Sequence, residues 1–492
     1  MPAQQLILMW SGRQPGSRAS GAAPPGQTLS DTIRVKGADL MQSIRSTQLK
    51  AELEAVSAVL DATPPVDTTR AIPTHEYQAR QRRVWEAVAS LGCDAGFVFS
   101  NEHYEGDVPY LAGNTNITVE QVAGVIGANG FHVIAGLEGG YVVEQLAVRS
   151  GAPVHKVEML QLADEDYPIA AERPEAVFEQ ACGRQPRRIA LLSPREVVPV
   201  MLVEWLREHY GPDSVVPASD VYGRIKYEKS DAEMQLTRDA VTIGDAALRA
   251  MLAVLKPGLR ETQVAAWGYF ALRELGAEES GVDIMVSAGR SNRSLIGKAL
   301  NHVIQPGDMV HLGVSARRDG LCGCTRRSVV ALEPGQAMPA AHRYWLDFVV
   351  EAYRAGHEQF IVTARDNLPA FTIEKAVVDY VAGRSAEVAA RIGRPIDLVQ
   401  QKPYTCVHNG GYTECMEFYG AVTLATREPL GHQIVNMLDV AMRGIGNHWD
   451  DVIIPDLEYV VVENTFGKSG PLAECLNTVP ENCQALVGRG IA

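Results

Sequence analysis

A histidine in a glycine-rich turn offers the clearest chemistry in this chain. His408 opens the sequence His-Asn-Gly-Gly and is followed by Glu414 and Glu417. An imidazole titrates near neutral pH and a neighbouring carboxylate fixes its tautomer, so together they can transfer protons. Glu414 and Glu417 are three residues apart and share one side only if the segment is helical. We expect an acid/base site here whose acidic residues favour a small cation.

An arginine-containing loop could supply the opposite charge. Residues 287–294 read Ser-Ala-Gly-Arg-Ser-Asn-Arg-Ser, so Arg290 or Arg293 could hold a carboxylate through the planar fork of guanidinium donors. A site with this anion clamp on one side and acidic residues on the other would fit a zwitterion. Asp450 and Asp451 are further candidates for substrate contact, or are simply turn residues.

Two closely spaced cysteines allow a different site. Cys322 and Cys324 share one face of a strand, and with His311 and His408 they could form a zinc-like site of nitrogen and sulfur donors. The alternative is that both are buried thiols, the usual state of free cysteine, and that His311 is a surface histidine. The sequence leaves both interpretations open.

Composition and charge narrow the class of protein. The chain has 492 residues, of which 46% are hydrophobic and 21% charged, which is enough for two or three globular domains. A formal net charge of −14 without a basic run argues against nucleic acid and anionic membranes as partners. No stretch reaches the roughly 18 apolar residues of a transmembrane helix, and the first ten residues do not resemble a signal peptide. The eight cysteines are scattered, so we expect a reduced, cytoplasmic protein.

Residue patterns divide the chain into an arm and an α/β layer. Residues 11–30 are rich in Gly, Pro, Ser and Ala and predict a flexible arm, followed by a short helix at 38–60. A helix is predicted after Pro73, with Gly92 as its end. Apolar runs then alternate with helical stretches, which indicates an α/β layer domain. The predicted strands are 95–99, 121–126, 132–135 and 189–192, and the predicted helices 175–182 and 197–210.

The second domain is predicted to begin near residue 225. Ser230 is a suitable N-cap with Glu233 three residues on, and the helix that follows ends at residues 256–258, Lys-Pro-Gly. The predicted organisation is therefore a partly flexible arm at 1–72, a first domain at 73–225 and a catalytic domain at 226–492.

Several motifs resemble one known family. Residues 224–226 (Arg-Ile-Lys), Glu233 and residues 256–262 resemble the entry to the catalytic domain of the creatinase/prolidase/methionine aminopeptidase (pita-bread) family, and residues 307–326 resemble its first metal-binding hairpin. The likeness covers roughly residues 73–470. It implies an α/β (α+β) chain with a creatinase-type N-terminal domain and a C-terminal pita-bread domain. It also implies a homodimer in which the N-terminal domain covers a neighbour's site.

The same resemblance implies a dismantled metal centre. In the family, two Asp, one His and two Glu hold two metal ions that activate water. Here the hairpin offers Gly313 for the first Asp, and Cys324 or Gly323 for the second. His408 matches the ligand His. Matching by motif then places Met442 at the first Glu and Glu458 at the second. With three of five ligands missing, we expect no metal and no cofactor.

Creatinase works without metal, and its resemblance to this chain implies the leading function. We expect a metal-independent hydrolase that acts on a C–N bond of a small cationic or zwitterionic compound. His408 would be the acid/base and Glu458 its orienting carboxylate. The expected substrate contacts are Arg290, His311, Glu414, Glu417 and Arg326. Arg326 could equally be a structural pairing residue.

Three alternatives belong to the same fold. The loop at 287–294 resembles that of dimethylsulfoniopropionate lyases, which implies a lyase acting by proton abstraction. An Xaa-Pro metallopeptidase would need the metal centre. A binding module with a degenerate site would need no chemistry at all.

Overall fold

The computed structural model describes residues 29–113, 120–161, 167–294 and 296–491, with side chains from residue 45 onward except at 148. The chain divides into two compact units, residues 1–53 and 54–492. Helix α1 (Leu29–Ala62) begins in the first, where Arg45 pairs with Glu52 at 2.8 Å. The helix expected at 38–60 is confirmed and is longer than expected. Up to residue 28, the expected flexible arm lies outside the described residues.

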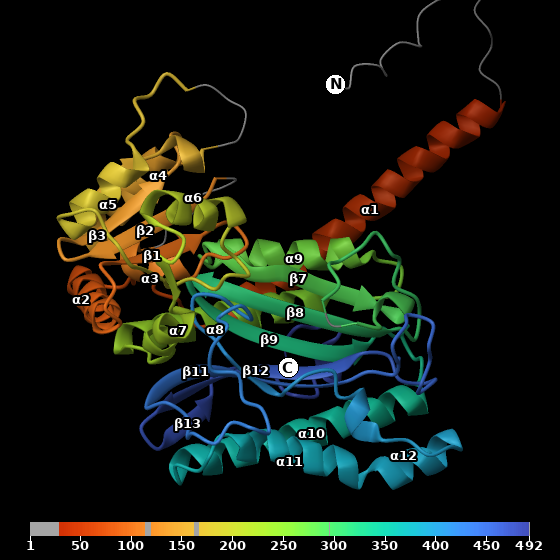
Figure 1. The fold of residues 1–492 in the computed structure, drawn as a ribbon. Coiled ribbons are helices and arrows are strands. Elements are labelled where there is room, and N and C mark those ends of the chain that lie inside the picture. The colour runs from red at the N-terminus through yellow and green to blue at the C-terminus, as the bar shows by residue number, and fades with distance from the viewer. Residues whose placement is uncertain (1–28, 114–119, 162–166, 295, 492) are drawn as a thin grey trace, which may run out of the picture. The chain divides into compact units, whose positions relative to one another are not determined.

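The second unit begins with a six-stranded sheet in the order β4-β3-β2-β1-β5-β6 (Figure 1). Strands β1, β2 and β3 are antiparallel neighbours, whereas β4, β5 and β6 join in parallel. The α/β layer is thus confirmed, and each strand and helix predicted for it has bounds within three residues of an observed element. The elements are α2 (Thr74–Ser90), β1 (Ala95–Ser100), α3 (Asp107–Ala112), β2 (Val122–Gly127), β3 (Gly130–Ala135), α4 (Gly139–Leu146), β4 (Val154–Lys156), α5 (Pro174–Cys182), β5 (Ile189–Leu191), α6 (Val200–Tyr210), β6 (Val215–Pro217) and α7 (Ser219–Tyr227).

A seven-stranded sheet follows, in the order β10-β11-β12-β9-β8-β7, with β13 paired to β12. Among the described residues, its neighbouring strands pair antiparallel. Its strands are β7 (Glu279–Ala288), β8 (Met309–Arg318), β9 (Leu321–Val330), β10 (Val407–Asn409), β11 (Gln433–Met442), β12 (Val460–Ser469) and β13 (Leu472–Cys475). The helices with it are α8 (Asp231–Val254), α9 (Glu261–Glu274), α10 (Ala340–Arg365), α11 (Phe371–Gly383) and α12 (Ser385–Ile392).

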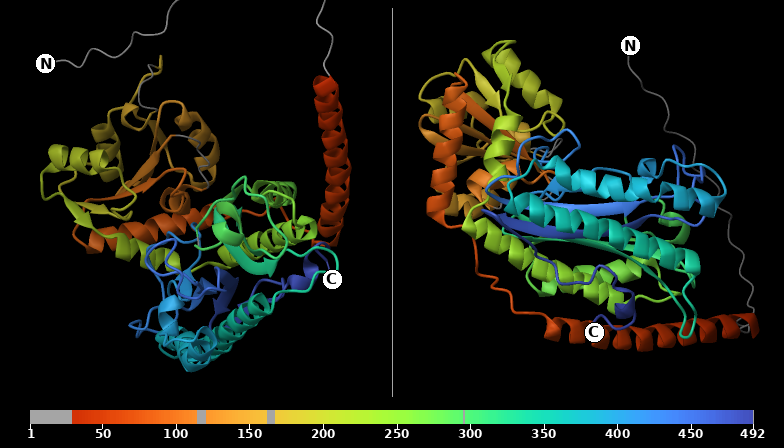
Figure 2. Two further views of the ribbon diagram at one scale, coloured as in Figure 1. Left: turned by 90° about the vertical axis from the view of Figure 1, so that its right-hand side faces the viewer. Right: turned by 90° about the horizontal axis from the view of Figure 1, so that it is seen from below.

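Helices cover one face of this second sheet. Because side chains alternate along a strand, directly paired residues of neighbouring strands point to the same side. Leu312, Arg327, Val462 and Val440 form one such row. Leu312 packs in the core with α8 and α9, while Val462 and Val440 pack with α10 and α11. The right-hand view of Figure 2, seen from below, shows α10 and α11 lying over the strands. The next row of residues must therefore face away from the helices.

The long helix α8 starts where the sequence predicts. Ser230 accepts a hydrogen bond from the backbone N–H of Glu233, and the Glu233 carboxylate accepts one from the backbone N–H of Ser230. This capping box satisfies two amides that the first helical turn leaves free. The helix ends at Val254, just before Lys256-Pro257-Gly258.

Buried charges join the first sheet to the second. Arg80 of α2 pairs with Glu233 of α8 at 2.9 Å, and Lys226 of α7 pairs with Asp107 at 2.7 Å and Glu417 at 2.8 Å. Tyr412 also packs into the core of the first sheet. Both sheets therefore belong to one compact unit, and the division near residue 225 stays an interpretation.

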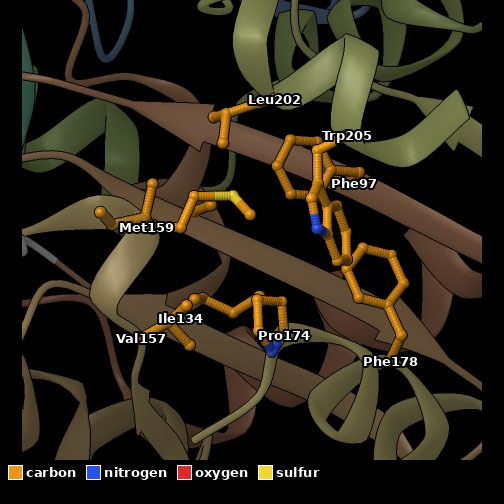
Figure 3. Close-up of a pocket in the computed structure, with 10 residues that line it drawn as sticks. Phe97, Ile134, Val157, Met159, Pro174, Phe178, Leu202 and Trp205 are labelled. Carbon is orange, nitrogen blue, oxygen red and sulfur yellow. The ribbon is translucent and has the colours of Figure 1, made fainter. Parts of the chain in front are cut away.

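A small hollow on the first sheet is entirely apolar. Its side chains converge between the strands and helices α5 and α6 (Figure 3), and none is titratable. They are Phe97, Ala123, Ile134, Val157, Met159, Leu160, Pro174, Phe178, Leu202 and Trp205. Within the described part of the chain, no helix has both the length and the apolar character needed to cross a bilayer.

We predict that Lys226→Met destabilises the protein by about 3–5 kcal/mol, because it leaves the buried carboxylates of Asp107 and Glu417 without a partner. Urea denaturation measures the change. Lys375→Met is the control, since Lys375 pairs with Asp379 on the surface and its loss should cost less than about 0.5 kcal/mol. Equal effects of the two substitutions would contradict a role for the buried lysine.

Candidate active site

A row of polar residues crosses four strands on the face turned away from the helices. Gly313 of β8 pairs with Arg326 of β9, Arg326 with Glu463 of β12, and Glu463 with Asp439 of β11. The three charged residues are at most 4% exposed. Strand pairing alone thus brings together side chains separated by more than a hundred residues in sequence.

The guanidinium of Arg326 lies at the centre of this row. Its Nη1 donates to Asp439 Oδ2 at 2.9 Å and to Glu463 Oε2 at 3.3 Å. Its Nη2 donates to the Tyr459 hydroxyl at 2.5 Å, and its Nε donates to His311 Nε2 at 3.1 Å. Arg326 is therefore bonded through each of its three nitrogens, and two of its partners are acids.

His408 stands at the open edge of the same cluster. It comes from β10, beside β11, and its side chain is 22% exposed. The Nε2 atom lies 3.2 Å from Glu463 Oε1 and 3.8 Å from Glu414 Oε1, and Nδ1 lies 3.3 Å from the backbone oxygen of Asn409. Both ring nitrogens face acceptors, which is the arrangement that a doubly protonated imidazolium satisfies.

Hydroxyl and thiol groups complete the surroundings of the acids. The Tyr404 hydroxyl donates to Asp439 Oδ1 at 2.9 Å and lies 2.5 Å from the Tyr459 hydroxyl. The Cys415 thiol donates to Glu414. The Cys324 sulfur lies close to Glu414 and Glu463.

These contacts set the protonation of the central pair. Burial lowers the pKa of His408, but the hydrogen bond with Glu463 and the charges of Glu414 and Glu463 outweigh it and raise that pKa to about 9. Burial raises the pKa of Glu463, yet the hydrogen bond with His408 and the charge of Arg326 bring it below its usual value. At neutral pH the pair is an imidazolium beside a carboxylate.

The pKa values of Asp439, Glu414 and His311 are shifted towards the neutral form of each group, whereas those of His408 and Glu463 are shifted towards the charged form. Burial and the charge of Glu463 raise the pKa of Asp439 to about 7, against the lowering effect of Arg326. Burial and the charge of Glu463 also raise the pKa of Glu414. Burial and the charge of Arg326 hold the pKa of His311 well below its ordinary value, so its ring is neutral and accepts from Arg326.

The residues present do not fit a centre of two metal ions. Two sets of donor atoms lie within 4.8 Å of one another, Cys324/Glu414/Glu463 and His408/Asp439/Glu463. In the second set Arg326 Nη1 already donates to both acids, so a guanidinium occupies the place next to them that a cation would need. On β8, Gly313 offers no donor side chain beside Arg326. We therefore assign no step to a metal.

Four of the side chains expected in the site are in the cluster. They are His408, His311, Glu414 and Arg326. His311 and Arg326 are at most 4% exposed, so they serve each other and the acids and have almost no surface to offer a substrate. The structural pairing considered for Arg326 is the role that its bonds support. Only His408 among the four is partly open to solvent.

The two glutamate positions inferred from motifs are corrected by the structure. Glu458 does not lie beside His408: it is half-buried near Asp308 and Arg293, before β12 begins. The carboxylate on His408 is that of Glu463, five residues later. Met442 packs into the core with α10, and Asp439 is the acid on that strand. The positions expected for the two glutamates were therefore wrong, whereas the hairpin offers Gly313 and Cys324 and no acid, as expected.

Other expected contacts lie elsewhere. Arg290 is 68% exposed and pairs with Asp450, so it does not clamp an anion in this cluster. Glu417 is buried against Lys226. The proposed set of two cysteines and two histidines is not assembled, since neither Cys322 nor His311 belongs to either group of metal-capable atoms among the described residues.

Reading strand alternation more strictly would have found the missed acids. In β12, Val460 and Val462 face the helices, so a glutamate at 463 must point to the other face. The same holds for Asp439 between Leu438 and Val440 of β11. An acidic residue next to apolar, helix-facing neighbours in each strand was the signal. The hairpin register is settled in the same way, because a side chain at Gly323 would meet Val241 of α8, whereas Cys324 faces the acids.

Glu458 provides a test that is separate from the cluster. Burial and the charge of Asp308 raise the pKa of Glu458 to about 8, and its Oε2 accepts no hydrogen bond from the described residues. The folded state therefore holds the proton more tightly than the unfolded state, and this group lowers the free energy of unfolding as pH rises from about 4.5 to about 8.

We predict that Glu458→Gln is more stable than wild type at pH 9 by roughly 1–3 kcal/mol, because it removes a poorly solvated charge. The difference should shrink towards pH 5, where the wild-type carboxyl is protonated. Urea denaturation at both pH values checks this, and a gain that is the same at both would show that charge is not the cause.

Comparison with known proteins agrees with this architecture. Residues 235–425 match metallopeptidase family M24. The chain is 29% identical over 133 residues to the uncharacterized peptidase YqhT of Bacillus subtilis, covering 27% of this chain and 38% of that protein. It is 23% identical over 223 residues to the Xaa-Pro dipeptidase of Pyrococcus horikoshii, covering 45% and 61%.

A solved structure extends the match over both sheets. The Xaa-Pro dipeptidase from Bacillus anthracis superposes with a TM-score of 0.61 at 18% identity, covering 82% of this chain and 98% of that one. In sequence, the matches span less than two thirds of the length of the curated relatives. The chain therefore has the pita-bread fold of these structures, and its residues 235–425 match metallopeptidase family M24.

Proposed function

We propose that this protein is a hydrolase that cleaves a C–N bond of a small cationic or zwitterionic compound without a metal ion. His408 is the proton donor and Glu414 the proton acceptor. The observation that carries the proposal is the pair of His408 and Glu463: an imidazolium at the open edge of the cluster, bonded at 3.2 Å to an ionised carboxylate.

The protons of a hydrolysis balance between two residues. Water attacks the carbon and gives one proton to Glu414, whose raised pKa makes it a stronger base than an ordinary glutamate. The C–N bond breaks and His408 gives its proton to the leaving nitrogen. Glu414 Oε1 lies 3.8 Å from His408 Nε2, so the proton can return to His408 and restore the starting state.

Charge favours a cationic substrate. The cluster holds three acidic side chains, Glu414, Asp439 and Glu463, and two cations, Arg326 and His408. Arg326 is fully engaged with its own partners and does not pair with Glu414, whose pKa is raised. A substrate ammonium or guanidinium group would pair with the ionised Glu414 and stabilise that form.

An Xaa-Pro dipeptidase is the second candidate. Two relatives carry that name, and the bond they are named for is also a C–N bond. This function requires a metal centre that the donor atoms described above do not fit. Assays of X-Pro dipeptides with and without Mn²⁺, beside a panel of guanidino and amino compounds, separate the two. A lyase would release an unsaturated product, and a binding module would convert nothing.

We predict that His408→Ala lowers kcat/KM by about 10²-fold or more, the usual effect of removing a general acid. The measurement is a steady-state assay on whichever compound of the panel is turned over. His75→Ala, an exposed histidine of α2, is the control and should leave the rate unchanged. Retention of full activity by the His408 variant would refute the proposed role.

The pH dependence follows from the raised pKa of His408. The acid form is the active one, so kcat/KM should stay level as pH approaches about 9 and then fall about tenfold per pH unit as the imidazolium loses its proton. An alkaline limb near pH 6.5 would mean that Glu463 does not hold the proton on His408 during the reaction.

A further inference from the structure

The neighbouring residues Arg326 and Arg327 form a natural contrast. Both are buried, at 4% and 0% exposure, and they point to opposite faces of β9. Arg327 donates to backbone oxygens and to the Asn464 side chain. Arg326 instead bonds to two acids. Arg327 therefore holds backbone segments together, whereas Arg326 compensates the charge of the two acids.

We propose that Arg326 is the resident cation of this site: its guanidinium neutralises Asp439 and Glu463 in place of a metal ion, fixes Glu463 against His408, and keeps divalent ions out. This inference rests on the proposed metal-independent function and identifies the residue that makes such a function possible. Arg326 is a positioning residue, because it acts on His408 through Glu463.

The geometry of Arg326 supports the first two parts of this role. Glu463 uses Oε2 towards Arg326 and Oε1 towards His408, so one carboxylate bridges the two cations. Tyr459 and His311 accept from the remaining nitrogens of Arg326 and leave it no freedom to turn away. A fixed guanidinium thus decides where the Glu463 carboxylate lies and keeps it ionised beside His408.

Gly313 makes room for this arginine. A Cβ atom at position 313 would lie 3.0 Å from Arg326 Cγ and 2.7 Å from Met285 Cε. The bare glycine therefore accommodates the aliphatic stem of Arg326, and an aspartate at 313 would collide with it. The place that Arg326 of β9 occupies is therefore open only because position 313 of β8 carries no side chain.

A divalent ion would meet the charge of Arg326. It would have to bind the oxygens of Asp439 and Glu463 that Arg326 Nη1 already contacts, at 2.9 and 3.3 Å, which places like charges side by side in a buried site. Removing the guanidinium eliminates this obstacle: it leaves Asp439 without a cation and Glu463 with His408 alone, which favours an ion.

The test measures Mn²⁺ binding to the full-length protein. Mn²⁺ prefers oxygen and imidazole donors, so it probes the acids and avoids the Cys324 thiol. We expect dialysed wild type to bind no Mn²⁺ in calorimetry and to show no change in Tm with about 1 mM MnCl₂. Arg326→Met should bind roughly one ion per chain, and its Tm should rise with MnCl₂, since a ligand of the folded state stabilises it. Arg327→Met, the matched control, should lose stability without gaining an ion.

Each other outcome is decisive. Stoichiometric Mn²⁺ on wild type would overturn both this inference and the proposed function. If folded Arg326→Met binds no ion, the inference alone is overturned. If Mn²⁺ binding is as expected but the wild type hydrolyses no compound of the panel, only the proposed function is overturned. If Arg326→Met folds only with Mn²⁺, the inference is supported. If Arg326→Met folds neither with nor without Mn²⁺, the double variant Arg326→Met/Asp439→Asn decides. This variant removes one cation and one acid together, so the inference requires it to fold. Its failure to fold would show that Arg326 does more than compensate charge.

Discussion

The contact on which the site depends is the buried guanidinium of Arg326 between the carboxylates of Asp439 and Glu463. Taking charges out of water is costly, and a buried ion pair is tolerated only when hydrogen bonds satisfy its remaining donors and acceptors. This requirement explains the neutral ring of His311 and the hydroxyls of Tyr404 and Tyr459 around the cluster. Removing Arg326 leaves Asp439 without a cation, whereas Glu463 keeps its contact with His408.

Strand pairing is what makes this contact possible. Arg326 and Asp439 are 113 residues apart, and they meet because β9 and β11 both flank β12. The alternation of side chains that sends Leu312 and Val462 into the helical core also sends their neighbours Gly313 and Glu463 to the opposite face. The hydrophobic core and the polar site therefore share one register, and a slip of one residue in any of these strands would destroy both.

Local features of the fold were predictable from the sequence, and long-range ones less so. The capping box at Ser230, the helix after Pro73 and the strands of the first sheet follow from turn residues and periodicity, which act within a few residues. His408 could be found because its turn is a local motif. Glu463 and Asp439 were missed because motif spacing was trusted over strand alternation, which moved the expected acids five residues early and three residues late. The pairing of Arg326 depends on register between distant strands and could not be derived from one sequence.

A built-in cation changes how such a site responds to its surroundings. A metal-bound site loses its charge balance when the ion leaves, whereas a guanidinium is covalently attached and stays protonated at any physiological pH. The variable element in this cluster is instead the proton on His408, held by Glu463 and open to solvent at the edge. The segment at residues 235–425 matches a family named for metallopeptidases, yet its paired strands place an arginine on β9 opposite a glycine on β8, so a fixed cation lies among the acids of this site.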